Sequence, residues 1–501
     1  MQFVASPQRY FQGFELNVSW CSSEGSEAAR LLFGECNASR GTSMKHLKPH
    51  FNLIGLLAVA ILVWMSVGTA WAAASKYQVA YRFQGGRDGA YPFAGLVADK
   101  NGNLYGTTYS GGRDSGLCQA DSGCGTVIQL RPPSTRGGSW RESVIYRFGP
   151  FAHPAASLAI DKAGNLYGTT AYAGQSDNGT VFELKRPTTL GGVWTKLTLY
   201  NFAGGNDGAT PVSSLVFDQA GNIYGTTEFG GGGPCTVFQK GQGCGAVFEL
   251  TPPTRLGGAW KESVLYSFIP ANDYPLAGLV FDGQGNLYGT TAGDQTASFG
   301  TVFELAPSSK GGGSWTQTTL YNFGSVQNDG NTPRGGLIVD QKGNLYGTTT
   351  AGGSENATQC DGLSYSGFGT VFELERPTVP DSGWKEKILY SFRGGRDGAC
   401  PAAALVSDGT GKFYATAASG GSQSGVCAEI GGCGTLFELK LSTGGSWSEV
   451  TLHEFEAGDD GLEPLSALIL GKGGLLFGTT AGGGGTCQFL TPCGTVFSVI
   501  P

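Results

Sequence analysis

Six aspartates recur at one position of a repeated sequence, and their spacing is the feature of this chain that could do chemistry. Each is followed within a few residues by a proline, and three stand in the form Gly-Gly-x-Asp-Gly. The six are Asp88, Asp207, Asp273, Asp329, Asp397 and Asp460. Arg87 and Arg396 directly precede two of them, and at the seventh place the sequence has His153 before the proline instead. All nine residues are therefore candidate binding residues.

A ring of carboxylates on one face could bind a cation, a sugar or a basic peptide. Two of the carboxylates could instead act as acid and base in the cleavage of a polysaccharide, with Asp88, Asp397 or Glu463 as candidates. The competing interpretation is structural, because Asp-Gly is a favourable turn sequence. A motif repeated six times with little change favours that interpretation, since binding sites usually lie where a repeat varies.

The composition excludes several classes of function. The chain has 32 Lys and Arg against 39 Asp and Glu, a net charge of −7, and no basic block, so we expect no nucleic-acid partner. Only four histidines occur, at 46, 50, 153 and 453, which leaves little for histidine-based catalysis or a metal site. No Gly-x-Ser-x-Gly nucleophile motif occurs. We therefore expect no cofactor and no metal, and a non-catalytic protein is favoured over an enzyme.

The N-terminal region has the layout of a secretory signal peptide. A short basic segment begins at Met44, an almost wholly apolar segment runs from Phe51 to Thr69, and small residues follow up to Ala74. Residues 44–74 are thus predicted to be a signal peptide, with an uncleaved membrane anchor as the alternative. Residues 1–43 are interpreted as an upstream extension or a disordered segment. After cleavage the protein would be secreted or periplasmic, without a membrane partner, and we expect a monomer.

Residues 75–501 consist of one sequence repeated seven times. Its most constant part is Leu-Tyr-Gly-Thr-Thr, whose aromatic residue stands at positions 105, 167, 224, 288, 346, 414 and 477, on average 62 residues apart. Three further segments recur in each copy, typified by Leu-Val-x-Asp, Gly-Thr-Val-Phe-Glu-Leu and Tyr-x-Phe. Taken in order, we call these four segments strands A (Leu-Val-x-Asp), B (Leu-Tyr-Gly-Thr-Thr), C (Gly-Thr-Val-Phe-Glu-Leu) and D (Tyr-x-Phe), because all are short and rich in β-branched and aromatic residues.

Seven copies of a four-stranded unit predict an all-β fold, a seven-bladed β-propeller with blades of about 62 residues. A β-solenoid is the main rival. The repeat, however, opens with a D strand near residues 76–83 and ends with a C strand near residues 494–500. The first strand would therefore complete the last blade and close the ring, which leaves no open edge. A Trp stands six residues before the Tyr or His of six D strands, and since six is even we expect both rings on one face of the strand. Blade packing is favoured over ligand stacking as the role of these tryptophans.

The strand order assigns the loops to two faces. In a propeller with strand A innermost, the D–A loops, which carry the aspartates, share a face with the B–C loops, so we expect the aspartates near the central channel. The cysteines lie on this face too and predict five disulfides: Cys118–Cys124, Cys235–Cys244, Cys360–Cys400, Cys427–Cys433 and Cys487–Cys493. Metal binding is the alternative, but the spacing is not that of a zinc site.

The repeat unit, from Tyr-x-Phe-x-Gly-Gly-x-Asp-Gly to Gly-Thr-Val-Phe-Glu-Leu, resembles the bacterial GloVer tandem repeat over residues 76–501. The resemblance implies an exported repeat protein of the choice-of-anchor kind and carries over no catalytic residue. The sequence shows no C-terminal sorting tail before Pro501.

The sequence thus favours an exported, non-catalytic propeller that binds a glycan, a peptide or a surface component on the face of the B–C and D–A loops. Aromatic residues of these loops could stack on sugars; they are Tyr91, Tyr109, Phe151, Tyr172, Phe229, Tyr274 and Tyr365. The alternatives are a carboxylate-dependent extracellular hydrolase or lyase, and a structural envelope or adhesion protein.

Overall fold

The computed structural model describes residues 77–113, 124–135, 138–189, 191–233, 235, 243–255, 257–269, 273–293, 298–308, 314–354, 360, 367–379, 382–484 and 493–501. The chain divides into two units, Met1–Lys76 and Tyr77–Pro501. The predicted extension at residues 1–43 and the predicted signal peptide at residues 44–74 lie outside the described residues. No helix in the part of the chain that the structure describes is long and apolar enough to span a membrane.

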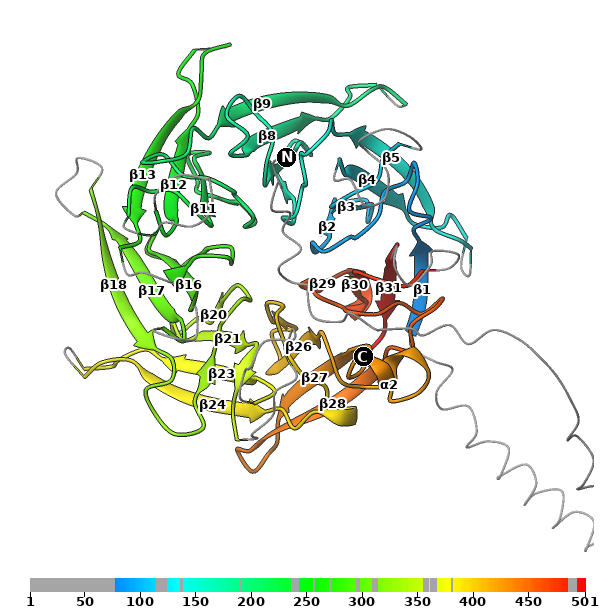
Figure 1. Ribbon diagram of the computed structural model, residues 1–501, viewed down its shortest axis with the longest axis vertical. Helices are drawn as coiled ribbons and strands as arrows, with labels where there is room; N and C mark the ends of the chain where they lie inside the picture. Colours follow the sequence, from blue (N-terminus) through cyan, green and yellow to red (C-terminus); the bar gives the residue numbers. More distant parts are fainter. Residues whose placement is uncertain are drawn as a thin grey trace, which may run out of the picture. The chain divides into compact units, whose positions relative to one another are not determined.

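The unit Tyr77–Pro501 is the predicted seven-bladed β-propeller (Figure 1). The innermost strands, A, are two residues long: β2 (Val97–Ala98), β6 (Ala159–Ile160), β10 (Val216–Phe217), β15 (Val280–Phe281), β20 (Ile338–Val339), β25 (Val406–Ser407) and β29 (Ile469–Leu470). The B strands are β3 (Leu104–Thr108), β7 (Leu166–Thr170), β11 (Ile223–Thr227), β16 (Leu287–Gly293), β21 (Leu345–Thr349), β26 (Lys412–Ala417) and β30 (Leu476–Thr480).

The C strands and the outermost D strands complete each antiparallel sheet. The C strands are β4 (Thr126–Arg131), β8 (Thr180–Lys185), β12 (Ala246–Thr251), β17 (Thr301–Pro307), β23 (Thr370–Glu375), β27 (Thr435–Leu441) and β31 (Thr495–Val499). The D strands are β5 (Arg141–Arg147), β9 (Thr195–Asn201), β13 (Lys261–Ser267), β18 (Trp315–Asn322), β24 (Lys385–Ser391), β28 (Trp447–Glu454) and β1 (Tyr77–Arg82). Short additions are β14 (Asp273–Tyr274), β19 (Gly330–Asn331), β22 (Ala351–Gly352), η3 (Gly395–Asp397), α2 (Val426–Glu429) and η4 (Lys472–Gly474).

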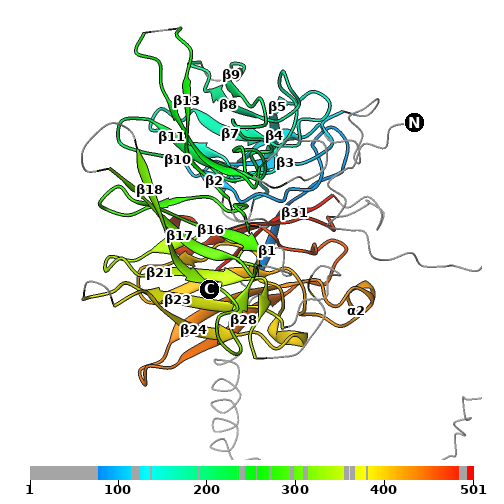
Figure 2. The same ribbon diagram turned by 60° about the vertical axis from the view of Figure 1, so that its left-hand side comes forward.

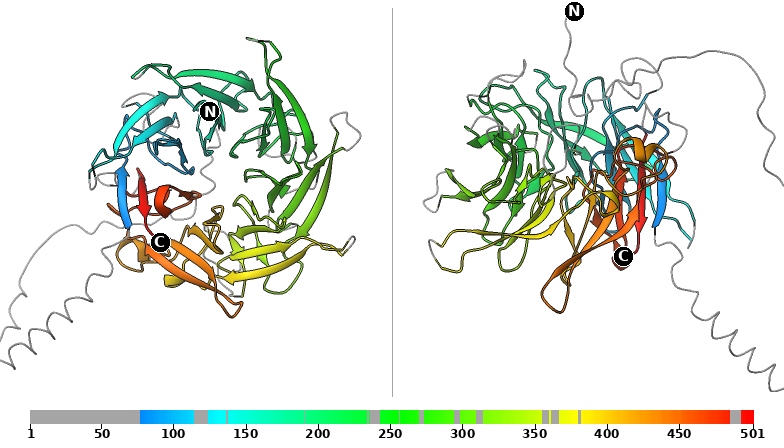
Figure 3. Two further views of the ribbon diagram at one scale, coloured as in Figure 1. Left: turned by 180° about the vertical axis from the view of Figure 1, so that it is seen from behind. Right: turned by 60° about the horizontal axis from the view of Figure 1, so that its bottom comes forward.

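The ring closes as the sequence predicts. The last sheet has the order β1-β31-β30-β29, so the first described strand pairs with the last strand of the chain. Figure 2 and the left view of Figure 3 show β1, in blue, beside the red strands of the C-terminus. Phe83, which follows β1, is fully buried among residues of blades 7 and 1.

The hydrophobic core lies between blades rather than within one. One cluster, for example, joins Tyr105 and Val127 of blade 1 to Leu166 and Phe182 of blade 2. In six of the seven B strands a central glycine makes room for this packing, whereas β26 has Ala415 at that position. A Cβ atom on Gly168 would lie 2.8 Å from the ring of Phe182, so only glycine fits there.

The tryptophans take part in packing, as expected, and they do so at the junctions between blades. The prediction that they share a face with the tyrosines is wrong. Trp140 contacts Phe477 of the preceding blade, whereas Tyr146 packs against the cluster shared with the following blade. The cause is a register shift in β5 between the partners of Val127 and Ile128, which inserts one extra residue into the strand. Because of this β-bulge, residues on its two sides that are an even number apart point to opposite faces of the strand. All seven D strands have such a bulge.

Candidate functional site

The D–A and B–C loops lie on one face and are hydrogen-bonded to each other. In blade 1, Ala90 of the D–A loop and Ser110 of the B–C loop form an isolated antiparallel bridge, and Gly112 N donates to Gly86 O at 2.9 Å. Equivalent bridges join Ala209 to Phe229, Ala399 to Ser419 and Leu462 to Gly482. The two sets of loops therefore form one continuous surface, as the strand order predicts.

The predicted disulfides lie on this face. Three are described: Cys235–Cys244, Cys360–Cys400 and Cys427–Cys433. Cys124 and Cys493 are disulfide-bonded as well, and the cysteines predicted to pair with them, Cys118 and Cys487, lie outside the described residues. The Cys360–Cys400 bond ties the B–C loop of blade 5 to the D–A loop that enters blade 6.

The loop aspartates hold their own turns against the outer strands. The Asp88 carboxylate accepts hydrogen bonds from the Tyr81 hydroxyl and from the backbone N–H of Gln84, both at 2.8 Å. Asp207, Asp329 and Asp397 accept the equivalent two hydrogen bonds in their own loops. Asp460 accepts the backbone bond from Glu456, and His453 takes the place of the tyrosine as its side-chain partner. Since the tyrosine belongs to a D strand, these carboxylates lie at the outer part of the face and not beside the channel. Asp273 is in β14.

Four of these aspartates face a glutamate of the next D strand across a blade junction. The pairs are Asp88 with Glu142, Asp207 with Glu262, Asp329 with Glu386 and Asp397 with Glu449. Burial, and then the neighbouring aspartate, raise the pKa of each glutamate to about 7. A buried oxygen of Glu142, Glu262 and Glu386 has no hydrogen-bond partner among the described residues. These glutamates are consequently protonated below neutral pH.

The raised pKa values of these glutamates predict that the stability of the propeller falls as pH rises. Each such glutamate has a pKa of about 7 in the folded protein and near 4.5 in the unfolded chain, so the folded protein binds the proton more tightly. Its contribution to stability is complete below the unfolded pKa and is lost as pH rises through about 7. We expect the melting temperature of the protein to fall between about pH 5 and about pH 8. Glu262→Gln should make that fall smaller, measured by thermal unfolding across this range. An identical fall in the variant would contradict the assignment.

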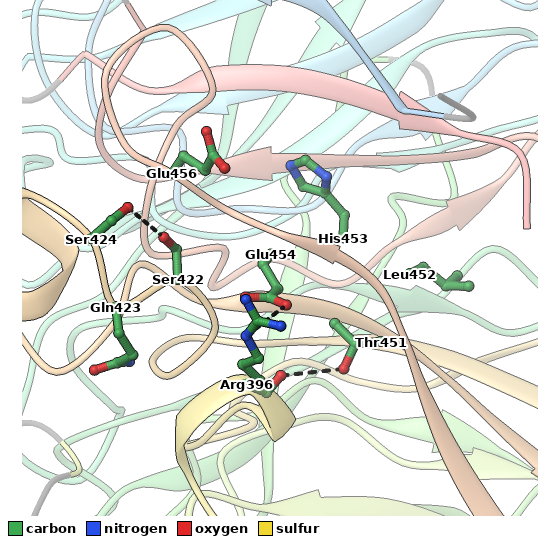
Figure 4. Close-up of a pocket in the computed structure, with 9 residues that line it drawn as sticks. All are labelled: Arg396, Ser422, Gln423, Ser424, Thr451, Leu452, His453, Glu454 and Glu456. Atoms are coloured by element: carbon green, nitrogen blue, oxygen red, sulfur yellow. Dashed lines mark hydrogen bonds and ion pairs between the residues drawn. The ribbon is translucent and has the colours of Figure 1, made fainter. Parts of the chain in front are cut away.

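A pocket of about 700 Å³ opens on the same face at blade 6 (Figure 4). Its walls come from the D–A loop at Arg396, from the B–C loop and from the end of β28. The lining residues are Arg396, Ser422, Gln423, Ser424, Thr451, Leu452, His453, Glu454 and Glu456. Gly421 N donates to Gly395 O at 2.7 Å, so the two loops that form the pocket are fixed to each other.

Polar groups dominate the pocket. Arg396 Nε lies 3.8 Å from Glu454 Oε1, and the Thr451 hydroxyl donates to the Arg396 carbonyl at 3.3 Å. The hydroxyls of Ser422 and Ser424 are 3.0 Å apart. The Arg396 side chain is 86% exposed, so its guanidinium is accessible from solvent. The arrangement offers hydrogen-bond donors and acceptors together with a paired charge.

His453 departs from the repeat at this pocket, and it is not among the site residues predicted from the sequence. Its Nε2 lies 3.0 Å from Asp460 Oδ2, and its ring stacks on Tyr77 with centroids 3.6 Å apart. Tyr77 stands on β1 at the position that Glu142 has on β5, four residues before the repeated tyrosine. In the sequence, His453 could have been recognised as a candidate because one copy of the seven has histidine where the others have tyrosine.

The other sequence-predicted residues lie apart from this pocket. Arg87 is exposed in the loop that enters blade 1. His153 is half-buried in blade 2, where its ring contacts Tyr109 and Tyr172. Phe151 is exposed, and Tyr365 lies outside the described residues. The structure thus brings Arg396 and the neighbourhood of Asp460 together, while His153 belongs to a separate cluster.

Solved structures with similar ring folds include several enzymes. A putative oxidoreductase (glucose dehydrogenase) from Thermus thermophilus is 18% identical, with 69% of this chain and 96% of that chain covered and a TM-score of 0.38. An ancestral GH74 enzyme is 10% identical, with 82% and 47% covered and a TM-score of 0.47. A PL25 ulvan lyase is 12% identical, with 81% and 89% covered and a TM-score of 0.41. Similarities at this level carry no conclusion about a reaction.

Among curated proteins, none matches the chain. The family model described as Gloeobacter/Verrucomicrobia repeat matches residues 115–360, a segment that lies within the ring described above. The strands and turns of the matched segment recur in the rest of residues 76–501. Residues 115–360, just under half of the chain, thus match the Gloeobacter/Verrucomicrobia repeat, and they belong to a ring folded as a seven-bladed propeller.

Proposed function

We propose that this protein is an exported, non-catalytic propeller that binds a glycan on the face formed by the B–C and D–A loops. The observation that carries the proposal is the polar pocket at blade 6. Its volume of about 700 Å³ is within the usual range for small-molecule sites. Its lining is rich in hydroxyl, amide, carboxylate and guanidinium groups, which is the chemistry that recognises a ligand bearing many hydroxyls.

The charges in the pocket favour a neutral ligand over a strongly ionic one. Arg396 is already paired with Glu454, and Glu456 adds one further carboxylate at the rim. A sugar hydroxyl can donate to a carboxylate and accept from a guanidinium at once, so vicinal hydroxyls fit an Arg–Glu pair. Leu452 supplies an apolar patch of the wall against which the C–H groups of a sugar ring could pack.

Export is supported by the disulfides and by the N-terminal sequence. Three described disulfides, each on the loop face, are typical of proteins that fold in an oxidising compartment. Residues 44–74, which lie outside the described residues, would supply the signal peptide. Determination of the N-terminal residue of protein recovered from the medium or periplasm tests this part, since cleavage is expected near residues 72–74.

Arg396→Ala is expected to weaken glycan binding by about tenfold or more, because one charge-assisted contact is lost and Glu454 is left unpaired. The protein is first screened by thermal shift against cellohexaose, xylohexaose and maltohexaose, and the affinity for the best hexamer is then measured by calorimetry. Arg87→Ala is the matched control, because Arg87 has the same place in its Gly-Gly-Arg-Asp-Gly turn but does not line this pocket.

Two outcomes would contradict the proposal. If Arg396→Ala and Arg87→Ala weaken glycan binding equally, the pocket is not the binding site. Release of shorter oligosaccharides during incubation would show turnover and favour the carboxylate-dependent hydrolase or lyase instead.

A further inference from the structure

Five rings form a continuous aromatic strip across blades 1 and 2, away from the pocket. The members of this aromatic strip are Tyr91, Phe93, Tyr109, His153 and Tyr172. The ring centroids are 5.6 Å apart for Tyr91 and Phe93, and 5.3 Å for Phe93 and Tyr109. They are 4.3 Å apart for Tyr109 and His153, and 5.4 Å for His153 and Tyr172. All five side chains are half-buried, so the strip belongs to the surface rather than to the core.

The fold places the strip on the inner part of the loop face. In these D–A loops, the carbonyl of the residue before the proline accepts from the first residue after strand B. These bonds join Tyr109 N to Tyr91 O at 2.9 Å and Ala171 N to His153 O at 3.0 Å. Residues 91 and 153 stand at the end of their loops that leads into the innermost strands β2 and β6.

The backbone holds two of the rings in fixed positions. Tyr91 and His153 have φ angles of 56° and 48°, in the left-handed region that residues with a side chain rarely adopt. Each precedes a proline, which also disfavours the right-handed helical region for it. Such conformations persist only where the surrounding structure enforces them, so the rings are presented with little freedom.

The strip is a departure from the repeat, unlike the aspartate turns. The corresponding residues before the prolines are Thr210, Thr332, Cys400 and Glu463 in blades 3, 5, 6 and 7, and blade 4 has one other aromatic residue there, Tyr274. The residues that take the place of Tyr109 after the repeated Thr-Thr are Ala292, Ala418 and Ala481 in blades 4, 6 and 7. The scaffold therefore does not need aromatic rings at these positions.

The strip combines ring faces with polar tips. Burial, followed by the neighbouring Tyr172 and Glu228, raises the pKa of Tyr109, so its hydroxyl stays protonated. Tyrosine and histidine pair a flat apolar body with a hydrogen-bonding end. The C–H face of a pyranose ring is apolar and its edge carries hydroxyls, which matches both parts of the strip.

We propose that the aromatic strip is a second subsite, which stacks the pyranose rings of a neutral glycan chain on Tyr109 and His153. This inference rests on the proposed function, since it names a further contact surface for the same class of ligand on the same face.

The test uses the full chain and whichever of cellohexaose, xylohexaose and maltohexaose binds best by calorimetry. His153→Asn removes the imidazole ring while asparagine tolerates the left-handed backbone, and Tyr109→Leu removes a ring but keeps an apolar side chain. Each is expected to weaken binding by about tenfold, whereas Tyr109→Phe, which keeps the ring, stays within about threefold of the native protein. Val193→Ala, in the exposed loop between β8 and β9, is the control and should leave the affinity unchanged. Unaltered melting temperatures verify that the variants fold.

The outcomes separate the strip from the pocket. If His153→Asn and Tyr109→Leu bind the hexamer with native affinity while Arg396→Ala binds it more weakly, the aromatic strip is not a subsite. The proposed function would still stand. Absence of saturable binding for all three hexamers would overturn both. Should Tyr109→Leu fail to fold, His153→Asn and Tyr109→Phe still decide the matter, because a strip that stacks sugars requires weakening in the first and near-native affinity in the second.

Discussion

Removal of residues 77–84 is expected to open the ring and to abolish its cooperative unfolding at the native melting temperature. The deletion takes away β1, the pairing partner of β31 from Tyr77 opposite Val499 to Arg82 opposite Thr495. It also removes Phe83, whose side chain is fully buried between blades 7 and 1. Loss of one buried phenylalanine alone costs about 3–5 kcal/mol, a large fraction of the total stability of a typical protein, about 5–15 kcal/mol.

A graded pair of substitutions separates ring closure from simple truncation. Phe83→Ala keeps the backbone of the closing strand and is expected to lose about 3–5 kcal/mol in denaturant unfolding. Gln78→Ala, on the same strand but exposed, is expected to change stability by less than about 0.5 kcal/mol. A deletion variant that melts at the native temperature would show that β1 does not close the ring.

Removal of the Cys360–Cys400 disulfide has the second-largest expected effect. The bond spans 40 residues, so the chain-entropy relation predicts a loss of about 4 kcal/mol when both cysteines are replaced by alanine. Both residues are fully buried and belong to one apolar cluster with Ala351 and Ala399, so some packing is lost as well. Denaturant unfolding of the double variant against the native protein measures the effect.

The Cys427–Cys433 disulfide is the matched comparison. It spans only 6 residues, for which the same relation gives about 2 kcal/mol. It also closes the loop around α2, which follows the pocket residues Ser422 to Ser424. Its double alanine variant should therefore lose less stability but more glycan affinity than the Cys360–Cys400 variant. A larger stability loss from the shorter loop would contradict the entropic explanation.

The architecture could be predicted from the sequence because it depends on features repeated seven times. The spacing of the Leu-Tyr-Gly-Thr-Thr segments defines the number of blades, and the position of a D strand before the first A strand defines the closure. The Cys360–Cys400 pairing followed from the same topology, since it needed only the assignment of two loops to one face.

The chemistry of the face was harder to predict because it depends on side chains that meet across blades. Asp88 and Glu142 are 54 positions apart, and no local pattern shows that they face each other at a junction. The aspartates were expected beside the channel, but hydrogen bonds to D-strand tyrosines such as Tyr81 hold them at the outer edge. One extra residue in D strands such as β5 likewise places the tyrosine and the preceding tryptophan on opposite faces of the strand.

Departures from the repeat were the more useful guide to candidate sites. His453 replaces a tyrosine and lines the pocket, and His153, which precedes the proline of the one D–A loop without the aspartate, joins the aromatic strip. Both replacements are visible in the sequence, but the pocket and the strip appear only when the loops of neighbouring blades are assembled. Repeated aspartates such as Asp88 and Asp207, by contrast, hold the turns of the scaffold on which these departures are placed.

The two histidines also provide the most direct test of binding on this face. Imidazole C–H resonances of the full chain, labelled with 13C-histidine and assigned with His153→Asn and His453→Gln, report on the strip and on the pocket separately. Titration with the best-binding hexasaccharide is expected to shift the resonances of both His153 and His453 in a saturable manner. Saturable binding by calorimetry with neither His153 nor His453 shifted would place the ligand elsewhere and contradict the proposed function.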